Sequence, residues 1–409
     1  MLSGQMVFTL LLLLALSVAA HEAPLFLLCL ALLVAALISR LWERYALARV
    51  EYRRSFGSSR VEFGDEVELA IEVVNRKPLP LSWLEVEDEI PASLQVLRGR
   101  VQPSYRADRC VLASLMAMRP YERVRRHYLL RCPARGEHLF GPAKLHSGDL
   151  FGFALCDRTV ESRDSLVVYP RVVPLERLGL PANNPLGDIR AQSWIFDDPS
   201  RVAGAREYRP GDSMRRVHWP ATARSGRLQT RLYEATTAHK LGVFLNVSAG
   251  EGPAWTYGFD PDVLEFSIVV AASVVAWGLD RGYQVGLYSN GLHRGAGGVS
   301  IDPASSPRQM EAVLLALARL EPIAGERFED LLDRESRRLP FGMTAIVVSP
   351  GLSEGDIGAL RQLRGVGHGL VAVLTGRGVA AASVPGVLVR RAGPPDGWRS
   401  MPAVRVGAG

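Results

Sequence analysis

The chain has 409 residues, of which 48% are hydrophobic and 22% are charged, and its formal net charge is +6. It is too long and too apolar for a disordered regulator, and too charged for a transporter that crosses the membrane many times. None of its four cysteines forms a CxxC pair, so neither a disulfide scaffold nor a zinc ribbon is indicated.

Two apolar runs near the start of the chain predict a transmembrane helical hairpin over residues 1–45. The runs cover residues 6–20 and 25–38, and Pro24 between them suits a turn or the first position of a new helix. Each run is at the short end of the roughly 17–25 residues that span a bilayer, so flanking residues are expected to extend both.

The arginines around these runs predict the orientation of the hairpin. No Lys or Arg stands between the runs, whereas five arginines follow the second run, namely Arg40, Arg44, Arg49, Arg53 and Arg54. The positive-inside rule therefore predicts a multi-pass protein of the cell membrane whose soluble domains are cytoplasmic. An alternative interpretation is a signal peptide cleaved after Ala20, although it lacks a basic n-region.

Residues 46–155 predict a small β-sandwich-like domain. Val67, Leu69, Ile71 and Val73 alternate with glutamates, and the same alternation returns over residues 83–90. Apolar residues at every second position are typical of strands with one face buried. Turn residues punctuate these strands, as in several short strands of a sandwich. The segment carries no catalytic constellation, so we interpret it as a spacer or an interaction domain.

The remainder predicts an α/β domain behind a connector. Residues 156–236 form the connector, residues 237–395 alternate strands with helices, and residues 396–409 are a C-terminal tail. A strand over 241–246 shows no alternation, as expected for a sheet covered on both faces. The apolar run over 266–279 is short for a membrane span and predicts a buried helix. The order of elements predicts a doubly wound parallel sheet.

The connector contains the densest candidate functional segment. Residues 201–231 contain eight arginines against two acids, Glu207 and Asp212, and guanidinium groups bind phosphate or carboxylate in a bidentate manner. One interpretation is a binding site for an acidic protein partner or phosphate, and nucleic acid is a weaker one because few aromatic residues offer stacking. The alternative is that these arginines pair with acids and tie two domains together. The candidate binding residues are Arg206, Tyr208, Asp212, Arg215, Arg216, Trp219, Arg224 and Arg227.

The same segment resembles the domain of unknown function 58 family. The resemblance rests on fixed spacings over about 30 residues, at Tyr208, Gly211-Asp212, Arg215-Arg216, Trp219, Ala223-Arg224, Leu228 and Glu234. Members of the family often have a basic residue after the tryptophan, where this chain has Pro220. The resemblance implies a von Willebrand factor A-like fold for residues 237–395 and a partnership with a MoxR-type AAA ATPase. It implies no established enzymatic activity.

A metal site is the second functional hypothesis. Domains of the von Willebrand factor A kind bind Mg²⁺ through Asp-x-Ser-x-Ser after their first strand, and this chain has Asn246-Val-Ser248-Ala-Gly250 there. Asn246 and Ser248 offer only neutral oxygens, so they are weak candidate ligands for a hard cation. We therefore predict no cofactor, with Mg²⁺ as the alternative.

Motifs for chemistry are missing elsewhere in the sequence. It contains no GxxxxGK[ST] loop, no HExxH and no GxSxG, so we predict that the protein is not an enzyme. The first hypothesis is a membrane-anchored adaptor whose soluble domains face the cytoplasm and work with a MoxR-type AAA ATPase through protein–protein interaction. The alternative is a divalent-metal-dependent ligand-binding protein with a degenerate metal-ion-dependent adhesion site. Nucleic acid is not an expected partner, and the sequence does not determine the oligomeric state.

Overall fold

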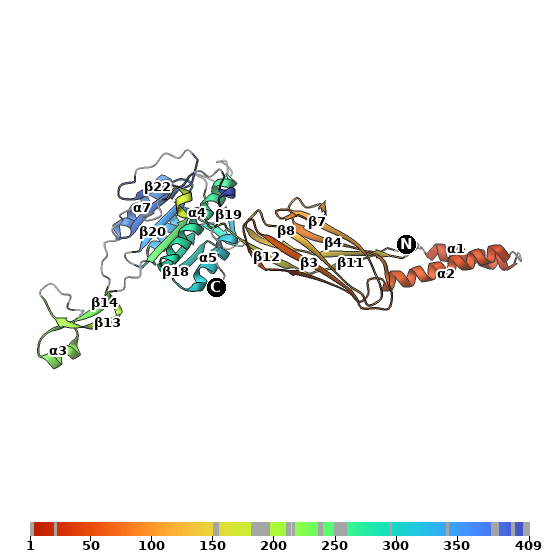
Figure 1. Cartoon of the computed structure of the whole chain (residues 1–409), viewed down its shortest axis with the longest axis horizontal. Helices are drawn as coiled ribbons and strands as arrows, with labels where there is room; N and C mark the ends of the chain where they lie inside the picture. The colour runs from red at the N-terminus through yellow and green to blue at the C-terminus, as the bar shows by residue number, and fades with distance from the viewer. Residues whose placement is uncertain are drawn as a thin grey trace. The chain divides into compact units, whose positions relative to one another are not determined.

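Figure 1 shows the computed structural model of the chain. Its contacts divide the chain into two compact units, Met1–Tyr169 and Pro170–Gly409. The structure describes residues 4–19, 23–149, 155–180, 197–209, 214, 217–235, 240–248, 260–293, 297–340, 343–377, 384–393 and 397–403.

The first unit begins with two helices that pack side by side, α1 (Gly4–Ala19) and α2 (Ala23–Tyr45) (Figure 1). Within α2, the stretch Ala23–Arg40 has a mean hydropathy of 2.3, and only 17% of it is buried. The apolar part of α1 is shorter, Phe8–Ser17. α2 is therefore long and apolar enough to cross a membrane, and its apolar side chains are left uncovered by the rest of the chain.

The rest of the first unit is a β-sandwich-like arrangement of mostly antiparallel strands. The strand order is β1-β3-β8-β5 in one sheet, β11-β10-β4-β7-β6 in a second and β2-β12-β9 in a third. The strands are β1 (Val50–Phe56), β2 (Arg60–Glu62), β3 (Glu66–Asn75), β4 (Leu81–Pro91), β5 (Gln95–Val96), β6 (Arg100–Pro103), β7 (Arg109–Met118), β8 (Arg123–Arg131), β9 (Gly136–Phe140), β10 (Ala143–Gly148), β11 (Leu155–Val160) and β12 (Asp164–Tyr169).

The predicted alternation agrees with the observed burial in these strands. Val67, Leu69, Ile71 and Val73 of β3 are buried in one hydrophobic core with residues from the other sheets. The unit extends past the border predicted at residue 155, because β11 pairs with β10 and β12 pairs with β9. Residues 155–169 therefore belong to the sandwich and not to the connector.

The second unit contains a six-stranded sheet in the order β18-β16-β15-β20-β21-β22 and two separate two-stranded ribbons, β13-β14 and β17-β19. Its strands are β13 (Asp197–Glu207), β14 (Gln229–Ala235), β15 (Lys240–Leu245), β16 (Gln284–Ser289), β17 (Gly291–His293), β18 (Val299–Ala304), β19 (Leu320–Ala324), β20 (Thr344–Ser349), β21 (Gly369–Leu374) and β22 (Leu388–Arg391). Its helices are the 3₁₀ helix η1 (Leu175–Leu178), α3 (Trp219–Ser225), α4 (Pro261–Asp280), α5 (Pro307–Ala318), α6 (Phe328–Ser336), α7 (Glu354–Gly365) and the 3₁₀ helix η3 (Trp398–Ser400).

Local signals explain where its helices begin. Asp260 caps α4 by accepting hydrogen bonds from the backbone of Asp262 and Val263, and Pro261 occupies the first turn. Ser353 and Asp356 form a capping box at the start of α7. The prediction of a buried helix over 266–279 is confirmed, since 72% of α4 is buried.

The predicted fold class is wrong. The described part of the chain is mixed α and β, with 40% of its residues in strands and 31% in helices, and antiparallel sheets make up much of it. It is therefore not described by a von Willebrand factor A-like, doubly wound parallel fold. Part of the reason lies in a short connection that the strand–helix pattern did not predict. Only nine residues separate β16 from β18, and the two strands pair antiparallel. A strand that returns through a short loop must run antiparallel to its neighbour.

Candidate functional site

The arginine-rich segment folds as a small module of its own, residues 197–235, made of β13, α3 and β14. The two strands pair antiparallel, with Ala205 opposite Arg231 and Glu207 opposite Gln229. The pairing continues past β13, because Tyr208 N donates to Leu228 O at 2.9 Å. We call residues 197–235 the arginine module.

Helix α3 is capped and joined to β14 at its N-terminal end. The His218 side chain accepts a hydrogen bond from Ala221 N at 3.1 Å, and His218 N donates to Gln229 O at 2.7 Å. A residue that precedes proline usually has an extended backbone, yet Trp219 is the first residue of the helix. Pro220 fits the first turn because the amide it lacks would have no partner within the helix.

The module exposes three large apolar side chains. Trp219 is 62% exposed, and Met214 and Leu228 are also exposed. Tryptophan and arginine are both enriched among the residues that contribute most to binding energy at protein interfaces. The exposed surface therefore combines apolar anchors with positive charge, as a docking surface for a protein does.

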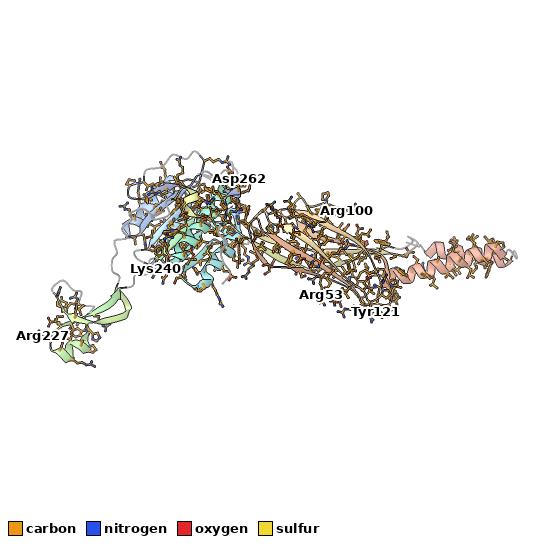
Figure 2. The ribbon with its side chains drawn as sticks, viewed as in Figure 1. Arg53, Arg100, Tyr121, Arg227, Lys240 and Asp262 are labelled. Atoms are coloured by element: carbon orange, nitrogen blue, oxygen red, sulfur yellow. The ribbon has the colours of Figure 1, made fainter. Side chains whose placement is uncertain are left out.

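The arginines of the module make weak internal contacts. Arg227 lies 3.0 Å from Glu207 across the ribbon, but both side chains are largely exposed. Exposed pairs of this kind contribute about 0–1 kcal/mol. Arg206 Nη1 donates to the carbonyl of Glu207 at 3.1 Å, and Arg224 is exposed in the last turn of α3. Figure 2 shows Arg227 on this module.

The structure brings five of the predicted binding residues into this module: Arg206, Tyr208, Trp219, Arg224 and Arg227. Asp212, Arg215 and Arg216 lie outside the described residues. The sequence interpretation missed Met214 as part of the surface. It could not have been found from its residue type, because an isolated methionine is more often buried than exposed.

The second candidate site is the carboxyl edge of the six-stranded sheet, where polar side chains follow three neighbouring strands. Asn246 follows β15, Asn290 follows β16 and Ser349 ends β20. The parallel strands β16, β15 and β20 all end at this edge. From β15 the chain continues to β16 on one side, and β20 lies on the other side. Ligands of open α/β sheets bind at such a change in strand order.

The hydrogen bonds of this edge leave little capacity for a ligand. Asn246 Oδ1 accepts from Ser248 N at 2.9 Å and from Asn290 Nδ2 at 3.2 Å, and Asn246 Nδ2 donates to Ser349 Oγ at 3.0 Å. Ser248 Oγ accepts from Asn290 Nδ2 at 3.1 Å. Because an amide oxygen has two lone pairs, a cation at Asn246 would have to displace an existing hydrogen bond.

Among the described residues, the first acid after β15 is already engaged in other contacts. Asp260, the nearest acid after β15 among the described residues, caps α4 and pairs with Arg377 at 3.4 Å. In the part of the chain that the structure describes, no group of three or more His, Cys, Asp or Glu side chains could hold a metal. The polar edge is best explained as a network that fixes the ends of the strands.

Comparison with known proteins shows which protein family the second unit resembles. The family model "Protein of unknown function DUF58" matches residues 204–377, which include most of the arginine module and most of the six-stranded sheet. The uncharacterized protein YeaD of Bacillus subtilis (strain 168) is 26% identical over 253 residues. That match covers 61% of this chain and 58% of the relative, so the chain spans little more than half of that protein.

Solved structures resemble only a part of the chain. A fragment of alpha-2-macroglobulin from Escherichia coli is 18% identical, covers 30% of this chain and 17% of its own, and has a TM-score of 0.23. A non-cellulosomal cohesin from Archaeoglobus fulgidus is 10% identical, covers 28% of this chain and 93% of its own, and has a TM-score of 0.19.

Proposed function

We propose that the protein is a membrane-anchored adaptor that faces the cytoplasm and docks an acidic protein partner through its arginine module. The observation that carries this proposal is the exposed Trp219 on a module in which Arg224 and Arg227 are also exposed. An exposed aromatic side chain on a module that also exposes arginines favours association with a surface that supplies an apolar pocket and carboxylates.

The partner that we propose is an AAA ATPase of the MoxR type. This part of the proposal is supported by the resemblance of the module to the domain of unknown function 58 family, together with the match of the family model to residues 204–377. The charge of the module agrees with an acidic partner surface, because opposite potentials accelerate association and set the register of the complex.

The partner proposal predicts that Arg224→Glu weakens docking on the order of tenfold at low ionic strength, with a smaller difference at high salt. Full-length protein is purified from its native membrane in mild detergent, with and without ATP, and the proteins that co-purify are identified. Arg308→Glu is the matched control, because Arg308 is an equally exposed arginine in the first turn of α5, outside the module. Equal recovery of an AAA ATPase with both variants, or its absence from the wild-type preparation, contradicts the proposal.

The anchoring part of the proposal concerns α1 and α2. Their exposed apolar side chains, among them Phe8, Leu27 and Leu37, need a hydrophobic surrounding, and the arginines after the span favour the cytoplasmic side. We expect trypsin to digest the soluble part in inside-out membrane vesicles and to leave it intact in spheroplasts. Digestion in spheroplasts with protection in inside-out vesicles contradicts this orientation.

A further inference from the structure

The turn between β7 and β8, residues 119–122, presents an exposed tyrosine at the end of the sandwich from which α2 leaves (Figure 2). Tyr121 is 70% exposed, and its backbone has a φ of 56°. This left-handed conformation favours glycine or asparagine and is uncommon for a bulky residue. Neither the core nor the geometry of the turn therefore explains an aromatic side chain at this position.

The β7–β8 turn is joined to the turn between β3 and β4. Asn75 is fully buried, and its Nδ2 donates to Leu79 O in the β3–β4 turn and to Arg119 O in the β7–β8 turn, both at 2.9 Å. A buried side chain that donates to both turns holds them in one arrangement. We call residues 76–80 and 119–122 the two-turn tip.

The tip lies close to the level at which α2 would leave a bilayer. Pro78 lines one pocket together with Ile38, which belongs to the apolar stretch Ala23–Arg40 of α2. Arg76 N donates to Arg49 O at 3.0 Å, just after α2. The helix ends five residues after its apolar stretch, a rise of about 8 Å, and the headgroup layer on each side of a bilayer is roughly 5–8 Å thick. The tip therefore reaches the headgroups where α2 crosses the membrane.

The backbone amides of the β7–β8 turn are all satisfied within the protein. Arg119 N donates to Glu122 Oε2, and Glu122 N donates to Arg119 O at 3.3 Å. Tyr121 N donates to Lys77 O at 3.3 Å, and Pro120 has no amide hydrogen. Unpaired amides cost free energy where water is scarce, so this turn can enter the membrane interface without that cost.

The exposed cations around the tip come from α2, from the segment after it, from both turns and from the start of β8. They are Arg44, Arg49, Arg76, Arg119 and Arg123. Two of them pair with acids, Arg76 with Glu51 at 2.6 Å and Arg123 with Glu72 at 3.7 Å. Because both arginine side chains are more than half exposed, these pairs are weak and do not hold the cations away from another anion.

We propose that the two-turn tip contacts the cytoplasmic surface of the membrane and binds anionic phospholipids there. The Tyr121 ring lies among the headgroups, as aromatic residues at membrane interfaces do, and the Arg119 guanidinium donates to lipid phosphates. Basic segments next to a membrane span are attracted to the negative potential of this leaflet. The contact holds the β-sandwich against the membrane at a second point besides α2.

The inference rests on the proposed anchoring of α2 in a membrane, and it is independent of partner docking by the arginine module. Its test compares two tyrosines at opposite ends of one strand. Tyr105 precedes β7 and is 83% exposed, whereas Tyr121 follows β7, and the ten residues of the strand separate the two turns by about 33 Å. Tyr105 therefore reports on an exposed turn of the same unit that lies far from the tip.

Full-length protein is incorporated, one copy per disc, into nanodiscs of phosphatidylcholine alone or with an equal amount of phosphatidylglycerol. Hydroxyl-radical labelling followed by mass spectrometry measures the oxidation rate of each tyrosine. We expect phosphatidylglycerol to lower the rate at Tyr121, relative to that at Tyr105, by about fivefold. High salt should reduce this difference, because it screens the attraction between the arginines and the lipids.

Arg119→Glu should abolish most of the effect of phosphatidylglycerol, because its carboxylate repels the lipid phosphates. Arg106→Glu is the matched control and should leave the effect unchanged, since Arg106 is an exposed arginine beside Tyr105 at the other end of β7. Circular dichroism shows that each variant is folded. Arg119→Gln removes the charge without adding one, so it remains informative if Arg119→Glu does not fold.

A rate at Tyr121 that does not depend on phosphatidylglycerol overturns the proposal, as does an equal response in the Arg119 and Arg106 variants. Protection that appears only with two copies in one disc assigns the tip to contact between copies and also overturns it. Protein that elutes apart from the discs contradicts the anchoring of α2 together with this inference. Protein that stays with the discs and leaves Tyr121 exposed overturns this inference alone.

Discussion

Replacing Arg54 with methionine is expected to lower the free energy of unfolding of the first unit by about 3–5 kcal/mol. The Arg54 and Asp88 side chains are fully buried, and Arg54 Nε donates to Asp88 Oδ2 at 2.9 Å. Tyr52 donates its hydroxyl to the same carboxylate at 2.8 Å. Without the guanidinium group, the Asp88 carboxylate would remain in the core as an uncompensated charge.

The effect is large because this arginine joins three sheets. Arg54 lies on β1, Asp88 on β4 of a second sheet, and Asp164 on β12 of the third, where Arg54 Nη1 donates to Asp164 Oδ2 at 2.6 Å. A urea titration of the full-length protein in detergent, followed by limited proteolysis of the first unit, measures the shift in the midpoint.

Arg53→Met is the matched control for this prediction. Arg53 is the adjacent residue on β1, but its side chain is exposed and pairs with the exposed Glu51 at 3.4 Å. We expect a change within about 0.5 kcal/mol. The double variant Arg54→Met with Asp88→Leu should recover most of the lost stability, because it removes both charges. An equal loss in the Arg53 and Arg54 variants would show that the ion pair is not the cause.

Replacing Trp219 with alanine is expected to weaken binding of the protein partner by at least about 2 kcal/mol, or roughly 30-fold in Kd. Because Trp219 is exposed in the free protein, the substitution should lower the free energy of binding and not that of folding. In the complex, the indole would fill a pocket of the partner. The stability of the arginine module itself should change by less than about 0.5 kcal/mol.

The measurement compares the Kd of the co-purified partner for wild-type and variant full-length protein in the same detergent. Tyr105→Ala serves as the control, since Tyr105 is 83% exposed and belongs to the first unit, not to the arginine module. Unchanged affinity of the Trp219 variant would show that the module is not part of the interface.

Single elements of this protein were predictable from the sequence because local chemistry specifies them. Alternating apolar residues identified β3 and β4, and the unbroken apolar run over 241–246 identified β15. Asp260-Pro261 marked the start of α4, and the length and charged flanks of its apolar run distinguished it from a membrane span. These signals depend on residues close in the chain.

The fold class could not be predicted in the same way. The direction of a strand depends on the strand with which it pairs. The sequences of β18 and of the β13-β14 ribbon show only weak periodicity, so their antiparallel pairings could not be predicted. The connector was predicted as one segment because its periodicity is weak, yet β11 and β12 complete the sandwich and the arginine module follows them separately.

By itself, the sequence determined the apolar helices, the individual strands and the concentration of arginine around Trp219. Only the tertiary structure decided which charges are neutralised and which donors are left without an acceptor. Arg53 and Arg54 are neighbours in the chain, but one is exposed and the other is buried against Asp88. Lys77 lies in a turn beside a proline, and only the tertiary packing makes it a buried lysine. The physical reason is that desolvation depends on neighbours brought together from distant positions, which no local pattern encodes.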